Sequence, residues 1–109
     1  MIAYCLTQAG SYEDYPFGDG TAALRHGGNH RIFALFLKHG EQELLNLKSA
    51  PFTALLLRNE FPSVIPGYHM NKVHWNSVIL DGTVPEDTVR EMIDDSYTLT
   101  RPKGRKRFA

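Results

Sequence analysis

The sequence predicts an α/β (α+β) fold, a two-layer sandwich in which a mostly antiparallel sheet carries helices on one face. The length of 109 residues fits one compact domain. Several short segments with alternating apolar residues are joined by links of hairpin length, which favours antiparallel strands. Two later stretches place apolar residues at helical spacing. A content of 42% hydrophobic and 22% charged residues is typical of an ordinary globular protein.

The amino-terminal part predicts a helix followed by a loop. Residues 2–9 place Ile2 and Leu6 on one side of a helix, which Gly10 would end. Residues 12–20 combine aromatic side chains with Pro and Gly. We therefore expect a structured loop there that packs against the body of the domain.

Three strands are expected next, joined by tight turns. Residues 21–25 form the first strand, and residues 26–30, which include two consecutive glycines, form a hairpin turn. Residues 31–38 are apolar at both alternating sets of positions, so we expect a central strand. Residues 42–47 alternate again and form the third strand.

The stretch after these strands predicts a helix that begins at Pro51 and ends before Pro62. Phe52, Leu55 and Leu56 have the i, i+3, i+4 spacing of one helix face, and Leu57 widens that face. We expect this face to dock on the sheet.

The last third of the chain predicts one more strand and one more helix. Residues 63–72 read as irregular, and residues 75–80 alternate like a strand. Thr83 and Glu86 match a capping box at a helix start. Pro102 ends this final helix, and its expected inner face consists of Val89, Met92, Ile93, Ser96 and Tyr97.

The formal net charge is zero, but the charges form blocks. Residues 101–107 hold five bases and no acid, so residues 1–100 carry seven bases and twelve acids, a net charge of −5. Residues 20–80 nevertheless carry six bases and three acids, a net charge of +3. Such blocks produce a field that attracts a polyanion to one face. Acidic, solvated helix faces are the alternative interpretation.

Cys5 is the single cysteine, so an internal disulfide is excluded, as is usual in a reducing compartment. No apolar run approaches the roughly 20 residues of a membrane span, and the first residues lack the basic start of a secretory signal. We therefore expect a cytoplasmic protein that has no contact with a membrane.

Catalytic and metal-binding residues are not expected. His69 and His74 lie five positions apart, a spacing that matches no zinc motif. Cys5 lies within the first predicted helix, where a small core residue is expected rather than a nucleophile. The sequence thus favours a non-enzymatic protein without a cofactor.

One segment, residues 66–76, differs in composition from the rest of the chain. It contains two His, two Asn, one Lys, one Tyr and the only Trp. Asn and Lys hydrogen-bond to phosphates and base edges, and the rings stack on bases or on another flat ligand. Core packing of the aromatic residues is the alternative interpretation.

Several motifs resemble those of the MmcQ/YjbR family of small bacterial proteins, in the order found in that family. They are Tyr15-Pro16-Phe17-Gly18, Pro66-Gly67-Tyr68-His69-Met70-Asn71-Lys72, His74-Trp75-Asn76, Asp81-Gly82, and Asp94 with Ser96-Tyr97. The resemblance covers residues 1–100 and implies a CyaY-like sandwich. It also implies DNA binding, with a double-wing surface of the sheet as the contact.

Two positions depart from the family pattern. Val73 stands where relatives often carry a base, which weakens a phosphate contact at that point. Ala50 stands where an acidic helix cap is common, so we expect Ser49 to cap the helix instead.

The leading hypothesis is therefore a DNA-binding module, monomeric, with one domain over residues 1–100 and a basic, mobile tail over residues 101–109. Hairpin wings and the segment 66–76 would contact the nucleic acid. The predicted contact residues are Arg25, Arg31, His69, Asn71, Lys72, His74, Asn76, Arg101, Lys103, Arg105, Lys106 and Arg107. The alternative hypothesis is a module that binds a protein or a small ligand, in which the loop 12–17 and the segment 68–75 line one aromatic pocket.

Overall fold

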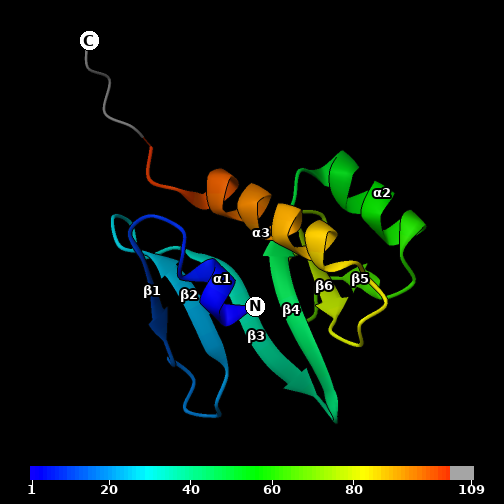
Figure 1. Ribbon diagram of the computed structural model, residues 1–109, viewed down its shortest axis with the longest axis horizontal. Coiled ribbons are helices and arrows are strands. Elements are labelled where there is room, and N and C mark those ends of the chain that lie inside the picture. Colours follow the sequence, from blue (N-terminus) through cyan, green and yellow to red (C-terminus); the bar gives the residue numbers. More distant parts are fainter. Residues whose placement is uncertain (104–109) are drawn as a thin grey trace, which may run out of the picture.

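The computed structural model describes residues 1–103 and has the predicted α+β architecture, with three helices and a six-stranded sheet (Figure 1). The helices are α1 (Ile2–Cys5), α2 (Pro51–Glu60) and α3 (Glu86–Thr100). The strands are β1 (Ser11–Asp14), β2 (Ala22–His26), β3 (Ile32–His39), β4 (Gln42–Lys48), β5 (Val64–Pro66) and β6 (Trp75–Ile79). Within these described residues, no helix is long and apolar enough to cross a membrane.

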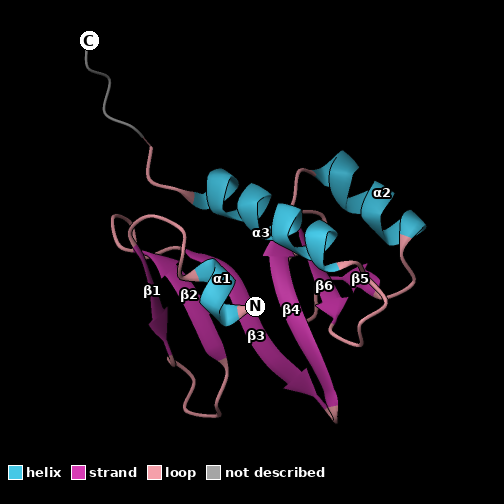
Figure 2. Ribbon diagram, in the orientation of Figure 1, coloured by secondary structure: helices cyan, strands magenta, loops and turns pink. Residues whose placement is uncertain are grey.

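The sheet has the order β1-β2-β3-β4-β6-β5, and every neighbouring pair is antiparallel. All three helices lie in front of it in the view of Figure 2, so the molecule is a two-layer sandwich. The two long strands β3 and β4 occupy the centre, as expected for a segment that is apolar at both sets of alternating positions. This arrangement confirms the predicted fold class.

Two strands lie where loops were expected. β1 pairs with β2, with Tyr12 opposite Arg25, and β5 pairs with β6, with Ile65 opposite Ser77. Both are edge strands of three or four residues. Segments this short show too little alternation to be recognised, and their pairing depends on a neighbour that is distant in sequence.

Helix α1 is shorter than the predicted helix over residues 2–9, since it ends at Cys5. The Ser11 hydroxyl lies 3.2 Å from the carbonyl oxygen of Cys5 and 2.7 Å from that of Gln8. The Thr7 hydroxyl donates to the carbonyl oxygen of Tyr4 at 2.6 Å. Each of these carbonyl oxygens also accepts the amide proton of the residue three positions later, so tight turns that the hydroxyl groups support follow α1 in place of further helix.

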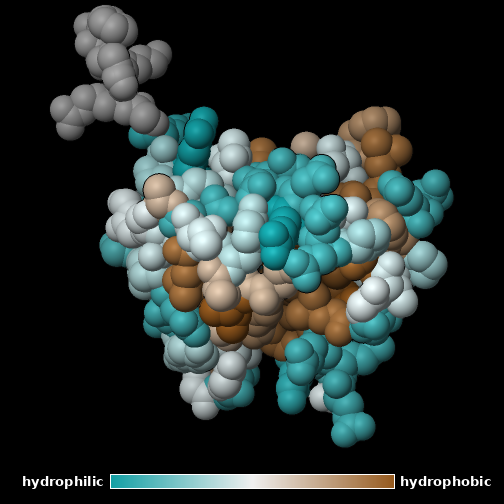
Figure 3. All heavy atoms as spheres, in the orientation of Figure 1, coloured by the Kyte–Doolittle hydropathy of each residue, from teal (hydrophilic) through white to brown (hydrophobic). Residues whose placement is uncertain are grey.

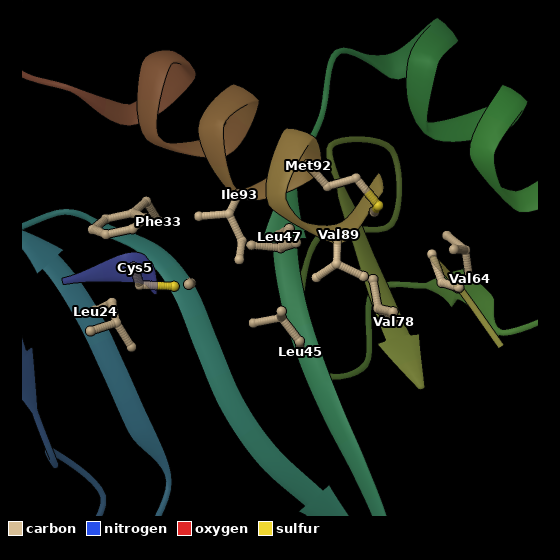
Figure 4. Packing of buried hydrophobic residues seen from close by; sticks show 12 residues of the cluster. Cys5, Leu24, Phe33, Leu45, Leu47, Val64, Val78, Val89, Met92 and Ile93 are labelled. Atoms are coloured by element: carbon tan, nitrogen blue, oxygen red, sulfur yellow. The ribbon is translucent and has the colours of Figure 1, made fainter. Parts of the chain in front are cut away.

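The hydrophobic core lies between α3 and the sheet (Figure 4). The spacing predicted for this helix is confirmed, because Val89, Met92, Ile93 and Ser96 are buried and Tyr97 packs against the core. The Ser96 hydroxyl donates to the carbonyl oxygen of Phe33 at 2.6 Å and accepts the Lys48 amide proton at 2.9 Å. A single serine therefore ties α3 to both central strands.

Both predicted side-chain caps are absent. The residue that caps α3 is Pro85, and the Thr83 side chain instead donates to Asp81 at 2.6 Å. The residue that caps α2 is Ala50, without a side-chain hydrogen bond, so Ser49 does not cap this helix. In both cases the proline next to the helix start already fixes the backbone and removes an amide that would need a partner.

The face predicted to dock α2 on the sheet points outward instead. Phe52, Leu55 and Leu56 are 73%, 58% and 51% exposed, whereas Ala54 is fully buried. Figure 3 shows brown, apolar side chains standing out over α2. The small Ala54 side chain lets the helix backbone approach β6, where the Asn76 amide donates to the Ala54 carbonyl oxygen at 3.1 Å. Polar attachment has overridden the amphipathic pattern.

Because α2 turns Ala54 rather than Leu55 toward the sheet, stability should depend more on Ala54 than on Leu55. Ala54→Leu should lower the free energy of unfolding by about 1–3 kcal/mol, because the larger side chain does not fit between α2 and β6 without pushing them apart. Leu55→Ala should change it by no more than about 0.5 kcal/mol, because this side chain faces solvent. Urea unfolding of both variants measures the difference. Equal losses in the two variants would mean that the helix docks through its apolar face after all.

Candidate nucleic-acid interface

The sheet has one face covered by helices and one open face. Because side chains alternate along a strand, the register assigns each strand residue to one of these faces. Buried Leu24, Leu45 and Val78 belong to the helix-covered face. The polar and aromatic strand residues of the open face are Tyr12, Asp14, Arg25, His39, Gln42, Asn46, Lys48, Trp75 and Ser77.

The segment 67–74 folds back over part of the open face. The Tyr68 amide donates to Ser77 Oγ at 2.8 Å, and the Tyr68 carbonyl oxygen accepts from Asn46 Nδ2 at 2.9 Å. The Ser77 hydroxyl donates in turn to Asn46 Oδ1. Asn46 and Ser77 have no exposed surface, so all three groups are held in a dry, fully paired network. This network fixes the segment on the sheet.

Arg58 of α2 anchors the other side of the same segment. Its Nε donates to Asn76 Oδ1 at 2.6 Å, and a terminal nitrogen donates to the carbonyl oxygens of Lys72 and, at 3.5 Å, of Trp75. No pattern in the sequence predicts this role, because Arg58 is distant from the segment along the chain. One guanidinium group therefore connects α2, β6 and the loop.

Asn76 was predicted to approach base edges, and the structure contradicts that prediction. Its side chain is fully buried on the helix-covered face of β6, where it binds Ala54 and Arg58. A side chain without exposed surface cannot read a base. The amide instead satisfies a helix carbonyl and a guanidinium group, which explains why a polar residue stands inside a strand.

The remaining predicted residues of the segment lie at the surface. Asn71 Oδ1 accepts the amide protons of Val73 at 2.9 Å and of His74 at 3.2 Å, an Asx turn that shapes the loop. Lys72 Nζ donates to the Gly67 carbonyl oxygen at 2.9 Å. His69 and His74 are exposed, and His69 has the left-handed backbone φ of 61°.

The turn between β2 and β3 brings the carboxyl end of α3 beside it. Asn29 Nδ2 donates to the Thr100 carbonyl oxygen at 3.0 Å, and Pro102 packs so closely on Gly28 that a Cβ there would lie 2.7 Å from its ring. The chain that follows α3 therefore runs beside the β2–β3 turn, which brings the exposed Arg101 and Lys103 to the end of the sheet where Arg31 is exposed. Arg105, Lys106 and Arg107 were also predicted as contacts, and they lie outside the described residues.

Arg25 is less free than its neighbours. Its Nε forms an ion pair with Asp14 at 2.8 Å, and a second nitrogen donates to the His30 carbonyl oxygen at 2.8 Å. Both contacts stabilise the β2–β3 hairpin against β1. The hairpin turns of residues 27–31 and 40–41 lie at opposite ends of β3, roughly 26 Å apart at 3.3 Å per residue. They are therefore not two adjacent wings.

The strands bring the basic residues to one end of the sheet. β3 begins where β4 ends and where β6 begins, because Ala34 pairs with Leu47 and Lys48 pairs with Trp75. The β2–β3 turn, Lys48 and the part of the segment that adjoins Trp75 thus share this end, whereas the Tyr68 ring reaches His39 toward the other end of β3. Lys48 was not among the predicted contacts, although extending the alternation of Leu45 and Leu47 by one residue places it on the open face.

The acids are distributed differently from the bases. Asp14 is the one acid that the register of the described strands assigns to the open face, and Arg25 neutralises it. Glu43 belongs to the helix-covered face, and α3 on that side carries the acids Glu86, Asp87, Glu91, Asp94 and Asp95. Among the described strand residues, the net negative charge of residues 1–100 therefore does not extend to the open face.

A hollow of about 490 Å³ opens on the helix-covered side, at the opposite end of β3. Ile2, Phe36 and Leu80 form its apolar wall, and Tyr15 and Asp19 stand at its margin. Figure 3 shows apolar side chains gathered on this face. No residue of the segment 68–75 lines this hollow, so it is not the pocket that the two aromatic segments were predicted to share.

His26 of β2 contacts the carboxyl end of α3 from the helix-covered face of the sheet. It is buried against the rings of Phe33 and Tyr97, with centroids 5.2 and 4.4 Å away. The Thr100 hydroxyl donates to the Ser96 carbonyl oxygen, so at 2.9 Å it accepts a proton from His26 Nε2. Burial lowers the pKa of His26, because the charged imidazole loses its hydration.

Comparisons with known proteins place this geometry among relatives. The model of the YjbR family matches residues 6–99. The uncharacterized protein YyaQ of Bacillus subtilis is 36% identical over 84% of this chain and 87% of its own length, and the uncharacterized protein YbdF of Escherichia coli is 40% identical over 78% and 68%. A crystal structure of a Deinococcus radiodurans protein is 38% identical, with a TM-score of 0.81 over 89% of this chain and 72% of that one. A Pseudomonas syringae crystal structure is 30% identical, with a TM-score of 0.81 over 92% and 95%.

The buried amide of Asn76 should matter for stability. Asn76→Ala leaves the Ala54 carbonyl oxygen and the Arg58 guanidinium without their partner, and should lower the free energy of unfolding by about 1–3 kcal/mol. Asn71→Ala, the matched control in the exposed turn, should cost less than about 1 kcal/mol. Chemical denaturation measures both. A fully stable Asn76→Ala protein would be inconsistent with a structural role.

The lowered pKa of His26 predicts a loss of stability in mild acid. Above its ordinary pKa of 6.5 the residue is neutral in both the folded and the unfolded chain. As the pH falls below that value the unfolded chain takes up the proton first, so the free energy of unfolding decreases. Denaturation between about pH 7.5 and pH 5.5 measures this slope.

His26→Gln removes the titrating group, so its slope across this range should be smaller than that of the parent chain. The exposed His74→Gln variant is the control and should keep the parental slope. Identical slopes in all three proteins would assign the pH dependence to other groups.

Proposed function

The chain belongs to the YjbR family, and from the charge layout of its sheet we propose that it is a cytoplasmic, non-enzymatic and monomeric DNA-binding protein that uses the open face and the basic end of the sheet. The observation that carries the proposal is the separation of charge between the two faces. The strand bases Arg25 and Lys48, together with Lys72 of the segment 67–74, lie toward the open face, whereas the acids of α3 lie on the other side.

Phosphates would contact the bases that are exposed at this end. Lys48 and Lys72 supply charge at the open face and the folded-back segment, and Arg31, Arg101 and Lys103 supply it beside the β2–β3 turn. Lysine and arginine neutralise phosphates without reading sequence. The proposed binding is therefore largely independent of sequence and strongly dependent on salt.

The orientation of the complex follows from the same layout. The acids of α3 would repel a polyanion, so the helix-covered face would turn away from DNA. Asp14 is neutralised by Arg25 in place. A domain whose first hundred residues have a net charge of −5 could bind a polyanion only by presenting such an oriented face.

Fluorescence anisotropy with a labelled DNA duplex across a salt series tests this proposal. The double variant Lys48→Gln/Lys72→Gln should weaken binding and reduce the slope of log affinity against log salt by about 2, one for each lost phosphate contact. Lys38→Gln is the control, because it removes one positive charge from the helix-covered face. It should leave both affinity and slope nearly unchanged.

Two results would contradict the proposal. One is an absence of binding by the full chain at low salt. The other is an equal loss per charge in Lys38→Gln and in the double variant, which would indicate a general charge effect rather than a surface.

The hollow on the helix-covered side favours a second candidate function, the binding of a small ligand. Its apolar wall and its marginal Asp19 and Tyr15 resemble the mixture of groups found in ligand sites. Binding there would survive high salt and would be insensitive to Lys48 and Lys72. The salt series therefore separates the two functions.

A further inference from the structure

Three rings form a cluster where the segment 67–74 crosses the open face. Tyr68 lies between two histidines, with its ring centroid 4.6 Å from that of His39 and 4.0 Å from that of His69. The ring planes meet at 52° and 47°. Both histidines are exposed, and Tyr68 is half-buried. The cluster thus presents flat imidazole surfaces to solvent.

The Tyr68 backbone is anchored to the sheet on both sides of its peptide unit. Both backbone polar groups of Tyr68 bind the buried Asn46 and Ser77. Gly67 precedes it so close to β6 that a Cβ there would lie 2.8 Å from that of Trp75. The backbone that carries the Tyr68 ring is therefore fixed before any ligand arrives, which lowers the cost of binding.

His69 adopts the left-handed backbone at φ 61°, a conformation that costs free energy for a residue with a side chain. The fold keeps this residue there, beside Tyr68, on the side of the sheet that no helix covers. Core packing does not account for exposed rings in this position. A strained, exposed and ordered residue is a recognised sign of a binding role.

We propose that the ring cluster of His39, Tyr68 and His69 stacks on unpaired bases, so that the chain prefers single-stranded over double-stranded DNA. The inference rests on the proposed DNA binding and names its substrate. In a duplex the faces of the bases are covered by their neighbours, and only unpaired bases offer them to a protein ring. Lys48 and Lys72 would hold the phosphates of the same strand.

The test compares a labelled oligothymidine with a duplex of equal length by fluorescence anisotropy, using the full chain. The parent protein should bind the single strand more tightly. The double variant His39→Gln/His69→Asn should lose roughly tenfold or more in single-strand affinity, the range expected for a lost stacked base. Its duplex affinity should stay unchanged. Asparagine tolerates the left-handed backbone, so the loop should keep its shape.

His30→Asn is the matched control, because His30 is the second exposed histidine with a left-handed backbone, at φ 60°. It lies in the β2–β3 turn beside Tyr12, away from the cluster. This variant should keep the parental preference for the single strand over the duplex. Thermal unfolding of each variant separates a lost ring from a lost fold.

The outcomes distinguish this inference from the function on which it rests. Salt-dependent duplex binding that equals single-strand binding, or that falls equally in the double variant, overturns the stacking cluster and leaves the phosphate surface intact. An absence of binding to either DNA overturns both. A single-strand preference that disappears with the two histidines supports both.

Discussion

Two buried asparagines on the neighbouring strands β4 and β6 determine how α2 and the segment 67–74 are attached to the sheet. Asn76 points to the helix-covered face and binds α2 through Ala54 and Arg58. Asn46 points to the open face and binds the segment 67–74 through Tyr68. Each amide is fully buried and fully paired, so neither can be removed without leaving a polar group unsatisfied. Packing alone would not fix these elements so firmly.

The consequence for the surface is a sheet with two different sides. Helix α3 covers one side and turns its acids to solvent, while the other side is covered only by the short segment that Asn46 holds. Bases and rings therefore collect where no helix can bury them. The charge blocks of the sequence become faces of the molecule through this one-sided covering, and the proposed function depends on it.

Arg58 links the two attachments. It comes from α2 and reaches the carbonyl oxygens of Lys72 and Trp75 as well as the amide of Asn76. The outer face of α2, with Phe52, Leu55 and Leu56, is left exposed because the polar contacts choose the orientation of the helix. Hydrogen bonds from Asn76 and Arg58, together with the buried Ala54 and the partly buried Leu57, hold this helix of ten residues in place.

The sequence by itself determined the fold class, the central strands and α3. Periods of two and of 3.6 residues were long enough there to be unambiguous, and the inner face of α3 agrees residue by residue. The family motifs located the segment 66–76. For the candidate site, the sequence supplied the exposed Arg31, His69, Lys72 and His74.

Only the tertiary structure decided which polar residues are free to act. Asn76 and His74 lie two positions apart in one motif, yet one is buried under α2 and the other is exposed. Lys48 and His39 joined the site because strand pairing and the folded-back segment bring them there. Composition reports which groups a segment contains. The partners of Asn76 at Ala54 and of Asn46 at Tyr68 lie 22 positions away, and such contacts leave no local pattern to read.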